Sequence, residues 1–219
     1  MQKIALIQIP MTPINNIINN IKELFDSKGI FPGNNTHSFL AAKNNITKFN
    51  LLHGVVPYSL LKFELSLPLN DYFTFVFLTD PIAKRLHSYR VLANSPITSP
   101  LRWNTMHVRG INEQVNFLSA LPEHLGPYTT QQHLESAKET IASLSGFGLI
   151  EKFPDSFRLL NDALTRLGYK VIKNTNISYP KPQIDVSPEV LSEIHGQEWA
   201  DLELYKFALA LFEQRTVKQ

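Results

Sequence analysis

The stretch from residue 73 to residue 92, FTFVFLTDPIAKRLHSYRVL, constrains the fold of this chain more than any other. Residues 73–78 are mostly apolar and β-prone, and polar and apolar side chains do not alternate. Such a strand is typical of a parallel sheet covered by helices on both faces. Next, Asp80 can cap a helix and Pro81 suits its first position, so a strand, a sharp turn and a helix are predicted. Parallel sheets bind ligands at such turns.

The rest of the chain repeats this alternation of strands and helices. Residues 3–9 form a short apolar run, and apolar residues within 14–25 recur at helical spacing, which predicts a second strand-turn-helix unit. Further strands are predicted at 49–58, 147–150 and, as an edge strand, 169–173, and further helices at 111–121, 132–144, 155–167, from 187 and at 200–212. We expect an α/β fold with a central, mostly parallel sheet flanked by helices, as one domain over residues 1–219. An irregular segment around 94–130 is expected to form a lid near the ligand-binding turns.

Composition narrows the classes of function. The net charge of +2 over 219 residues is small, and the basic residues are dispersed, so nucleic acid is not the expected partner. The absence of cysteine excludes a disulfide framework, a thiolate nucleophile and cysteine-based zinc sites, and the seven histidines lack metal-ligand spacing, so no metal is expected. There is no apolar run long enough for a membrane span and, with a strand beginning at Lys3, no room for a signal peptide. A cytoplasmic protein is the simplest expectation.

Five segments carry a resemblance to a known family. They are IPMTPINN at 9–16, HGVVPY at 53–58, LTDPIAKRLHSY at 78–89, FGLIEKF at 147–153 and DLELYKFA at 201–208. In this order they resemble the landmarks of sulfotransferases that use 3′-phosphoadenosine 5′-phosphosulfate and act on hydroxyl groups of carbohydrates and other acceptors. The resemblance spans nearly the whole chain. It implies a P-loop-like sulfotransferase architecture, this nucleotide as the sulfuryl donor, and a hydroxyl-bearing acceptor such as a carbohydrate.

The resemblance implies that the 5′-phosphate of the donor binds at the turn after the first strand. Met11 stands where the family has a lysine, and Ile14 stands where it has a glycine that permits close approach of the phosphate. Pro13 also removes one backbone N–H. A threonine hydroxyl and the N–H groups at the helix start remain as donors. The expected donor-binding residues here are Thr12, Pro13, Ile14, Asn15 and Asn16.

The 3′-phosphate is expected at the turn near residue 80, and the two turns are expected to converge on one anion-binding cleft. Thr79 and His87 hold the positions of a family arginine and a family serine. Lys84 keeps the charge of another family arginine, and Arg85 or Ser88 can substitute from neighbouring positions. The expected donor-binding residues are therefore Thr79, Lys84, Arg85 and His87. Each lost charge-assisted contact costs about 1.5–3 kcal/mol, so two losses weaken donor binding by orders of magnitude unless other residues compensate.

Sulfuryl transfer needs a base for the acceptor hydroxyl, and His53 is the candidate. The alternative is that His53 is a hydrogen-bonded structural residue near a strand end, and that His87 is a packed helix residue. The candidate acceptor-binding residues lie in the irregular segment, for which the alternative is a surface loop held by one buried tryptophan. They are Arg102, Trp103, His107 and Arg109.

Two functions of different classes remain open. The first is a sulfotransferase-like enzyme in which neighbouring cations replace the missing phosphate ligands. The second is a non-catalytic or repurposed protein on the same scaffold, which has lost nucleotide binding and recognises an acceptor or a partner, for example as a homodimer. A different group transfer in the same cleft is a third option, for which the sequence offers no donor signature.

Overall fold

The computed structural model describes residues 2–93, 110–121, 129–173 and 187–217. Its core is a four-stranded sheet in the order β2-β1-β3-β4, and every pair of neighbouring strands is parallel. The strands are β1 (Lys3–Gln8), β2 (Leu51–Val55), β3 (Tyr72–Leu78) and β4 (Gly146–Leu149). The α/β prediction is therefore confirmed, and four of the five predicted strands are present.

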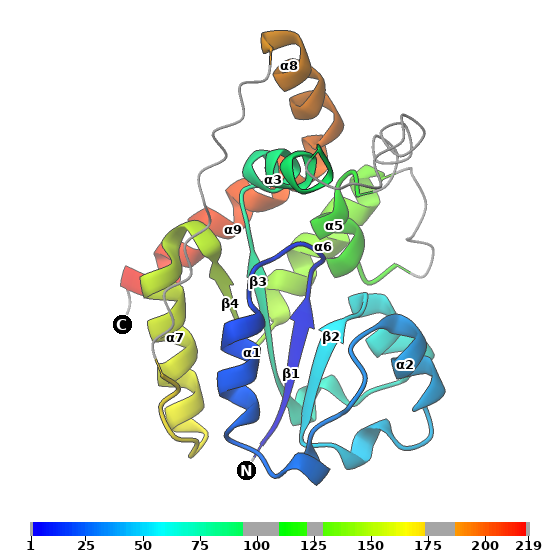
Figure 1. Ribbon diagram of the computed structural model, residues 1–219, viewed down its shortest axis with the longest axis vertical. Helices are drawn as coiled ribbons and strands as arrows, with labels where there is room; N and C mark the ends of the chain where they lie inside the picture. Colours follow the sequence, from blue (N-terminus) through cyan, green and yellow to red (C-terminus); the bar gives the residue numbers. More distant parts are fainter. Residues whose placement is uncertain (1, 94–109, 122–128, 174–186, 218–219) are drawn as a thin grey trace.

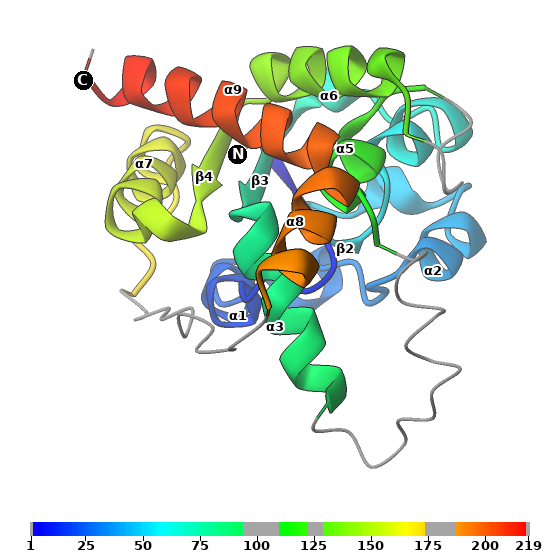
Figure 2. The same ribbon diagram turned by 90° about the horizontal axis from the view of Figure 1, so that it is seen from above.

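Helices cover both faces of this sheet (Figure 1). One face packs against α1 (Asn15–Lys22) and α7 (Phe153–Arg166), and the other packs against α5 (Glu113–Leu118), α6 (Gln131–Ser143) and α9 (Trp199–Val217). Figure 2, seen from above, shows α6 and α9 on the opposite side of the strands from α1. The remaining helices are α2 (Thr36–Ala41), α3 (Pro81–Ala93) and α8 (Pro188–Gln197). Short helical turns occupy Ser27–Gly29, Ile46–Lys48, Leu60–Glu64, Leu69–Asp71 and Ile150–Lys152.

Strand β3 is buried along its whole length, as its unbroken apolar sequence predicts. Phe73, Phe75 and Phe77 face the layer of α1 and α7, whereas the alternate residues Val76 and Leu78 face the layer of α6 and α9. After the strand, the Asp80 carboxylate accepts a hydrogen bond from the backbone N–H of Ala83 at 2.8 Å, and Pro81 begins α3. The predicted cap and first-turn proline are therefore confirmed. Figure 1 shows α3 beyond the carboxyl end of β3.

The edge strand predicted at 169–173 is wrong. This segment has no regular secondary structure and lies against α7. The side chain of Asn161 accepts a hydrogen bond from the backbone N–H of Ile172 at 2.9 Å, and the Tyr169 hydroxyl donates to the backbone carbonyl of Gln2 at 2.6 Å. The side chain of Asn161 thus satisfies a backbone N–H of this segment that a neighbouring strand would otherwise pair. The sheet instead ends at β4.

No helix in residues 2–93, 110–121, 129–173 and 187–217 is long and apolar enough to cross a membrane.

Candidate functional site

The turns after β1 and β3 meet at the carboxyl edge of the sheet, because these strands are adjacent and parallel. Met11 from the first turn and Pro81 from the second line the same pocket, which has a volume of about 170 Å³. This confirms the expected convergence of the two turns. The complete lining is Met11, Pro81, Lys84, Arg85, Ser88, Gly110, Glu113 and Glu198.

The first turn presents a buried hydroxyl and a strained residue. Met11 has a φ of 61°, in the left-handed region that side-chain-bearing residues rarely adopt, and its side chain is 44% exposed. Thr12 is buried, and its hydroxyl has no hydrogen-bond partner within the described part of the chain. Ile14 is turned into the core beside α1 instead of covering the helix start. Asn15 and Asn16 are exposed in the first turn of α1.

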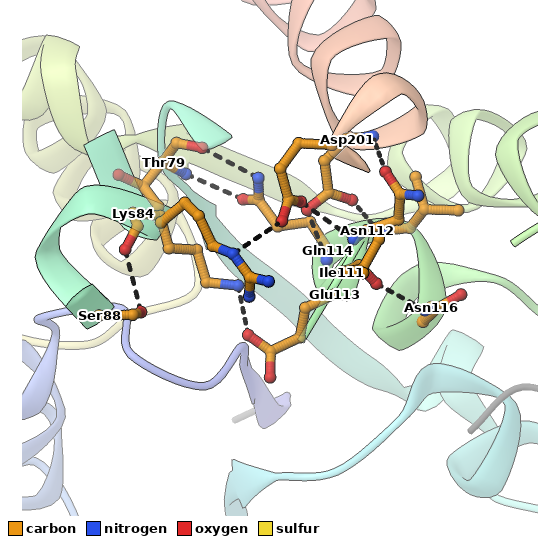
Figure 3. Close-up of polar contacts among 12 residues, drawn as sticks. Thr79, Lys84, Ser88, Ile111, Asn112, Glu113, Gln114, Asn116 and Asp201 are labelled. Carbon is orange, nitrogen blue, oxygen red and sulfur yellow. Dashed lines mark hydrogen bonds and ion pairs between the residues drawn. The ribbon is translucent and has the colours of Figure 1, made fainter. Parts of the chain in front are cut away.

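The second turn supplies two buried cations. Lys84 and Arg85 lie in α3 and are only 5% and 6% exposed. The Lys84 ammonium forms an ion pair with Glu113 (Figure 3). Nε of Arg85 lies 3.5 Å from Oε1 of Glu198. Ser88, one turn later, donates its hydroxyl to the backbone carbonyl of Lys84 at 3.0 Å. The pocket therefore contains cations that are already matched by carboxylates.

The starts of α5 and α9, which lie beside these carboxylates, cap each other. The Asp201 carboxylate, in the first turn of α9, accepts hydrogen bonds from the backbone N–H groups of Gln114 and Val115 at 3.0 and 2.8 Å. The side-chain oxygen of Asn112, before α5, accepts hydrogen bonds from the backbone N–H groups of Ala200 and Asp201 at 3.0 and 3.1 Å. Each helix start thus receives its cap from the other helix.

Asn112 also fixes Glu198. Its backbone N–H donates to Oε2 of Glu198 at 3.0 Å, and its backbone adopts a left-handed φ of 49°. The other oxygen of Glu198 is the one that faces Arg85. The start of α5 therefore sets the position of the carboxylate that neutralises Arg85.

Burial changes the acidity of these carboxyl groups. Desolvation, followed by the charge of Asp201, raises the pKa of Glu198 to about 7, and Arg85 opposes this shift. Desolvation also raises the pKa of Asp201, against the lowering effect of Lys84. A carboxyl group with a pKa near 7 gains or loses its proton around neutral pH. The net charge of the pocket therefore depends on the protonation of Glu198.

A second network ties the turn after β3 to β4 and α9. The side-chain amide of Gln114 pairs with both backbone groups of Thr79, at 3.0 and 2.9 Å. Oε1 of Glu151 accepts hydrogen bonds from the Thr79 hydroxyl and the Asp80 N–H, both at 2.8 Å, and its Oε2 accepts from the Tyr205 hydroxyl at 2.7 Å. Segments 78–89, 147–153 and 201–208, distant in sequence, thus meet at one turn.

The predicted donor-binding residues are only partly assembled. Lys84 and Arg85 line the pocket, whereas Thr12 follows the lining residue Met11 in the chain and is not itself among the lining residues. Thr79 is fully buried and engaged by Gln114 and Glu151, so in this arrangement it stabilises the turn. His87 is half-buried on α3 and does not line the pocket. The predicted acceptor-binding residues Arg102, Trp103, His107 and Arg109 lie outside the described residues.

His53 lies within β2, opposite Leu6 of β1, and is buried. Desolvation, assisted by the charge of Lys22, lowers its pKa to about 4, so the imidazole is neutral at neutral pH. Its neighbour Gly54 has a φ of 155°, and a Cβ there would lie 2.8 Å from the backbone of Asn34. The close approach of the Asn34 backbone therefore explains why position 54 is a glycine. His53 is not among the pocket residues, and its role as a base stays a prediction.

The acidic half of the site was not predicted from the sequence; it consists of Glu113, Glu198 and Asp201. Their only signal is their position at helix starts, where acidic residues commonly act as caps. Their pairing with α3 depends on contacts between segments that are distant in sequence.

Neither the models of known protein families nor the curated proteins match this chain. Within the described residues, no cluster of three or more His, Asp or Glu side chains is arranged to hold a metal ion.

Proposed function

We propose that this chain is a sulfotransferase-like transferase that moves a sulfuryl group from 3′-phosphoadenosine 5′-phosphosulfate to a hydroxyl acceptor, such as a carbohydrate, through an atypical donor site. The main support is the pocket at which the turns after β1 and β3 meet, with Lys84 and Arg85 buried in it. The sheet order suits a P-loop-like sulfotransferase architecture, because it places these two turns side by side. The five sequence segments add independent support.

The residues present fit one anionic group of such a donor. The Thr12 hydroxyl is buried without a partner in the described part of the chain, and a phosphate or sulfate oxygen is an acceptor that suits it. The N–H groups at the start of α1 favour an anion at the same turn. A volume of about 170 Å³ accommodates one such group, whereas pockets for drug-sized ligands occupy roughly 300–1,000 Å³. The remainder of the nucleotide is not placed by these residues.

Binding of an anion beside Lys84 and Arg85 requires that Glu198 is protonated. With Glu113 and Glu198 both ionised, the charges of Lys84 and Arg85 are already balanced. Protonation of Glu198, whose pKa is about 7, removes the carboxylate charge that faces Arg85. We therefore expect an anion to bind together with a proton.

The roles of the residues follow from this arrangement. The donor, when bound, supplies the activated sulfuryl group. Thr12 donates to an oxygen of the 5′-phosphate, on which charge develops as the sulfuryl group leaves, while Lys84 and Arg85 bind the 3′-phosphate. His53, neutral at neutral pH, stays the proposed acceptor of the proton from the acceptor hydroxyl.

Binding of adenosine 3′,5′-bisphosphate, measured by calorimetry, tests this function. We expect micromolar affinity for the native chain, and a decrease of about tenfold in Thr12→Val, because that variant lacks one hydrogen bond to a charged group. The melting temperature of Thr12→Val should not fall, since the hydroxyl bonds to nothing in the described structure. Thr165→Val, on the exposed side of α7, is the matched control and should bind normally. No binding at millimolar concentration near pH 6 and near pH 8 would remove the proposal.

A non-catalytic protein on the same scaffold is the second candidate, and one observation favours it. Glu113 and Glu198 are already paired with the cations that a donor would need, so the pocket is self-neutralised when both are ionised. This candidate predicts that the nucleotide does not bind either near pH 6 or near pH 8. The calorimetric experiment therefore separates the two candidates.

A further inference from the structure

A second pocket, of about 340 Å³, lies at the opposite end of β3 and β4. It shares no lining residue with the first. Leu159 and Ala163 of α7 form one wall, Phe212 of α9 forms the other, and β4 lies between these two helices (Figure 1). The complete lining is Phe73, Phe75, Leu144, Ser145, Gly146, Phe147, Leu159, Ala163, Arg166, Phe212 and Arg215.

The floor of this pocket is an edge strand with an outward-facing peptide group. The hydroxyl of Ser156 bonds to both the N–H and the C=O of Leu149, at 2.8 and 2.9 Å, so these groups of Leu149 point away from β3. Backbone groups of alternate residues in a strand point to the same side, so the N–H and C=O of Phe147 also point outward. The backbone N–H of Thr74 in β3 donates to the hydroxyl of Ser145, the residue before β4. This contact agrees with the assignment that the backbone groups of Phe147 point away from β3.

Two arginines give the apolar pocket a positive rim. The Arg215 guanidinium lies 5.2 Å from the centroid of the Phe147 ring and donates one hydrogen bond, to the Ala142 carbonyl at 3.1 Å. Arg166 lines the opposite side on α7, and no acidic side chain lines the pocket among the described residues. Burial lowers the pKa of Arg215, so a carboxylate beside it restores electrostatic stabilisation that water would otherwise provide. A guanidinium has five N–H donors, which leaves several for a ligand.

We propose that this pocket binds an N-acylated apolar amino acid. Its carboxylate lies at Arg215, because a guanidinium group binds a carboxylate in a bidentate way, and Arg166 adds positive charge at the rim. Its apolar side chain packs against Phe212 and Leu159, and its amide N–H donates to the outward C=O of Phe147, as an added strand does at a sheet edge. This site is separate from the proposed donor site, so either proposal can fail without the other.

Calorimetry with N-acetyl-L-phenylalanine tests this inference. Measurable binding is expected, with affinity at least tenfold weaker for N-acetyl-L-phenylalanine amide, which lacks the carboxylate. A similar loss is expected for 3-phenylpropanoate, which keeps the ring and the carboxylate but lacks the amide. Equal affinity for 3-phenylpropanoate would overturn the assignment to an acylated amino acid, and no binding at millimolar concentration would overturn the site itself.

Two variants of pocket residues test where the ligand binds. Ala163→Phe fills the pocket from α7 and should abolish binding, while Arg215→Gln should weaken it about tenfold and keep one amide donor for the Ala142 carbonyl. Arg158→Gln is the matched control, since Arg158 lies on α7, pairs with Asp155 and is exposed outside the pocket. Both test variants must retain the native melting temperature within a few degrees. Unchanged affinity in folded Arg215→Gln would contradict the proposed placement.

Discussion

At the scale of single residues, the protonation of Glu198 controls the charge of the candidate site. Glu198 is 2% exposed, faces Arg85 and accepts a hydrogen bond from the backbone of Asn112. A buried ion pair is weak support for stability, because desolvation offsets much of the attraction. The raised pKa of Glu198 is the consequence of that desolvation. The pocket thus keeps Arg85 paired at some cost in stability.

Glu198→Gln should change how stability depends on pH. The folded state binds the Glu198 proton more tightly than the unfolded chain does, so this residue stabilises the fold at low pH. That contribution is lost as the pH rises from the ordinary carboxyl pKa through about 7. We therefore expect the free energy of unfolding of Glu198→Gln to decline less between about pH 5 and about pH 8 than that of the native chain.

Urea unfolding at several pH values measures this difference. His53, whose pKa is lowered, acts in the opposite direction over part of this range, because its unfolded form binds the proton more tightly. That effect is common to both proteins and cancels in the comparison. Parallel pH profiles for the two proteins would show that Glu198 does not titrate as described.

At the scale of secondary-structure elements, the starts of α5 and α9 depend on each other. Asp201 caps α5, and Asn112 caps α9, so neither helix start satisfies its N–H groups from its own sequence alone. The family-like segment at 201–208 begins with this aspartate. Its role in the structure is therefore a cap on another helix, beside the pocket.

Asp201→Ala should destabilise the fold by about 1–3 kcal/mol, because two buried N–H groups of α5 lose their acceptor. Asp201→Asn keeps one oxygen acceptor and should cost less. Chemical denaturation measures both values. The surface variant Asp155→Ala, at an exposed first-turn position of α7, is the control and should change stability by less than about 1 kcal/mol. Equal costs at the two positions would contradict the capping role.

Much of the sheet could be predicted from local sequence, because β1 and β3 are mostly apolar runs that are each followed by a proline-containing turn and a helix. Residues 169–173 were mistaken for a strand because buried side chains such as Ile172 look alike in a strand and in an extended segment held by Asn161. Lys84 and Arg85 could be predicted as site residues from their position on the helix that begins after Asp80-Pro81. Glu113 and Glu198 could not be assigned to these cations, since their pairing depends on how α5 and α9 pack against α3.

At the scale of the whole molecule, Glu151 connects three layers around the turn after β3. Its carboxylate bonds to Thr79 and Asp80 on one side and to Tyr205 of α9 on the other. Burial, followed by the hydrogen bond to Glu151, raises the pKa of Tyr205, so the phenol stays protonated and donates. The strands and α9 are thus held together at the edge of the sheet where the pocket lies.

A double-mutant cycle of Tyr205→Phe and Thr79→Val tests this connection. Each single variant should cost about 0.5–3 kcal/mol, since each removes one hydrogen bond to a carboxylate. The double variant should deviate from the sum by at least about 0.5 kcal/mol, because both residues bond to Glu151. Tyr205→Phe combined with Thr165→Val is the control pair and should be additive. Additivity in both pairs would show that Glu151 does not couple the elements.

The exchange of caps between α5 and α9 has a consequence for how the protein is made. A ribosome releases residue 112 long before residue 201, so the beginning of α5 waits for its acceptor until α9 has emerged. A nascent chain that stops before α9 already carries the sheet, the two cations and the carboxylates Glu113 and Glu198 that face them. It lacks Asp201, so the first N–H groups of α5 have no carboxylate to accept from them.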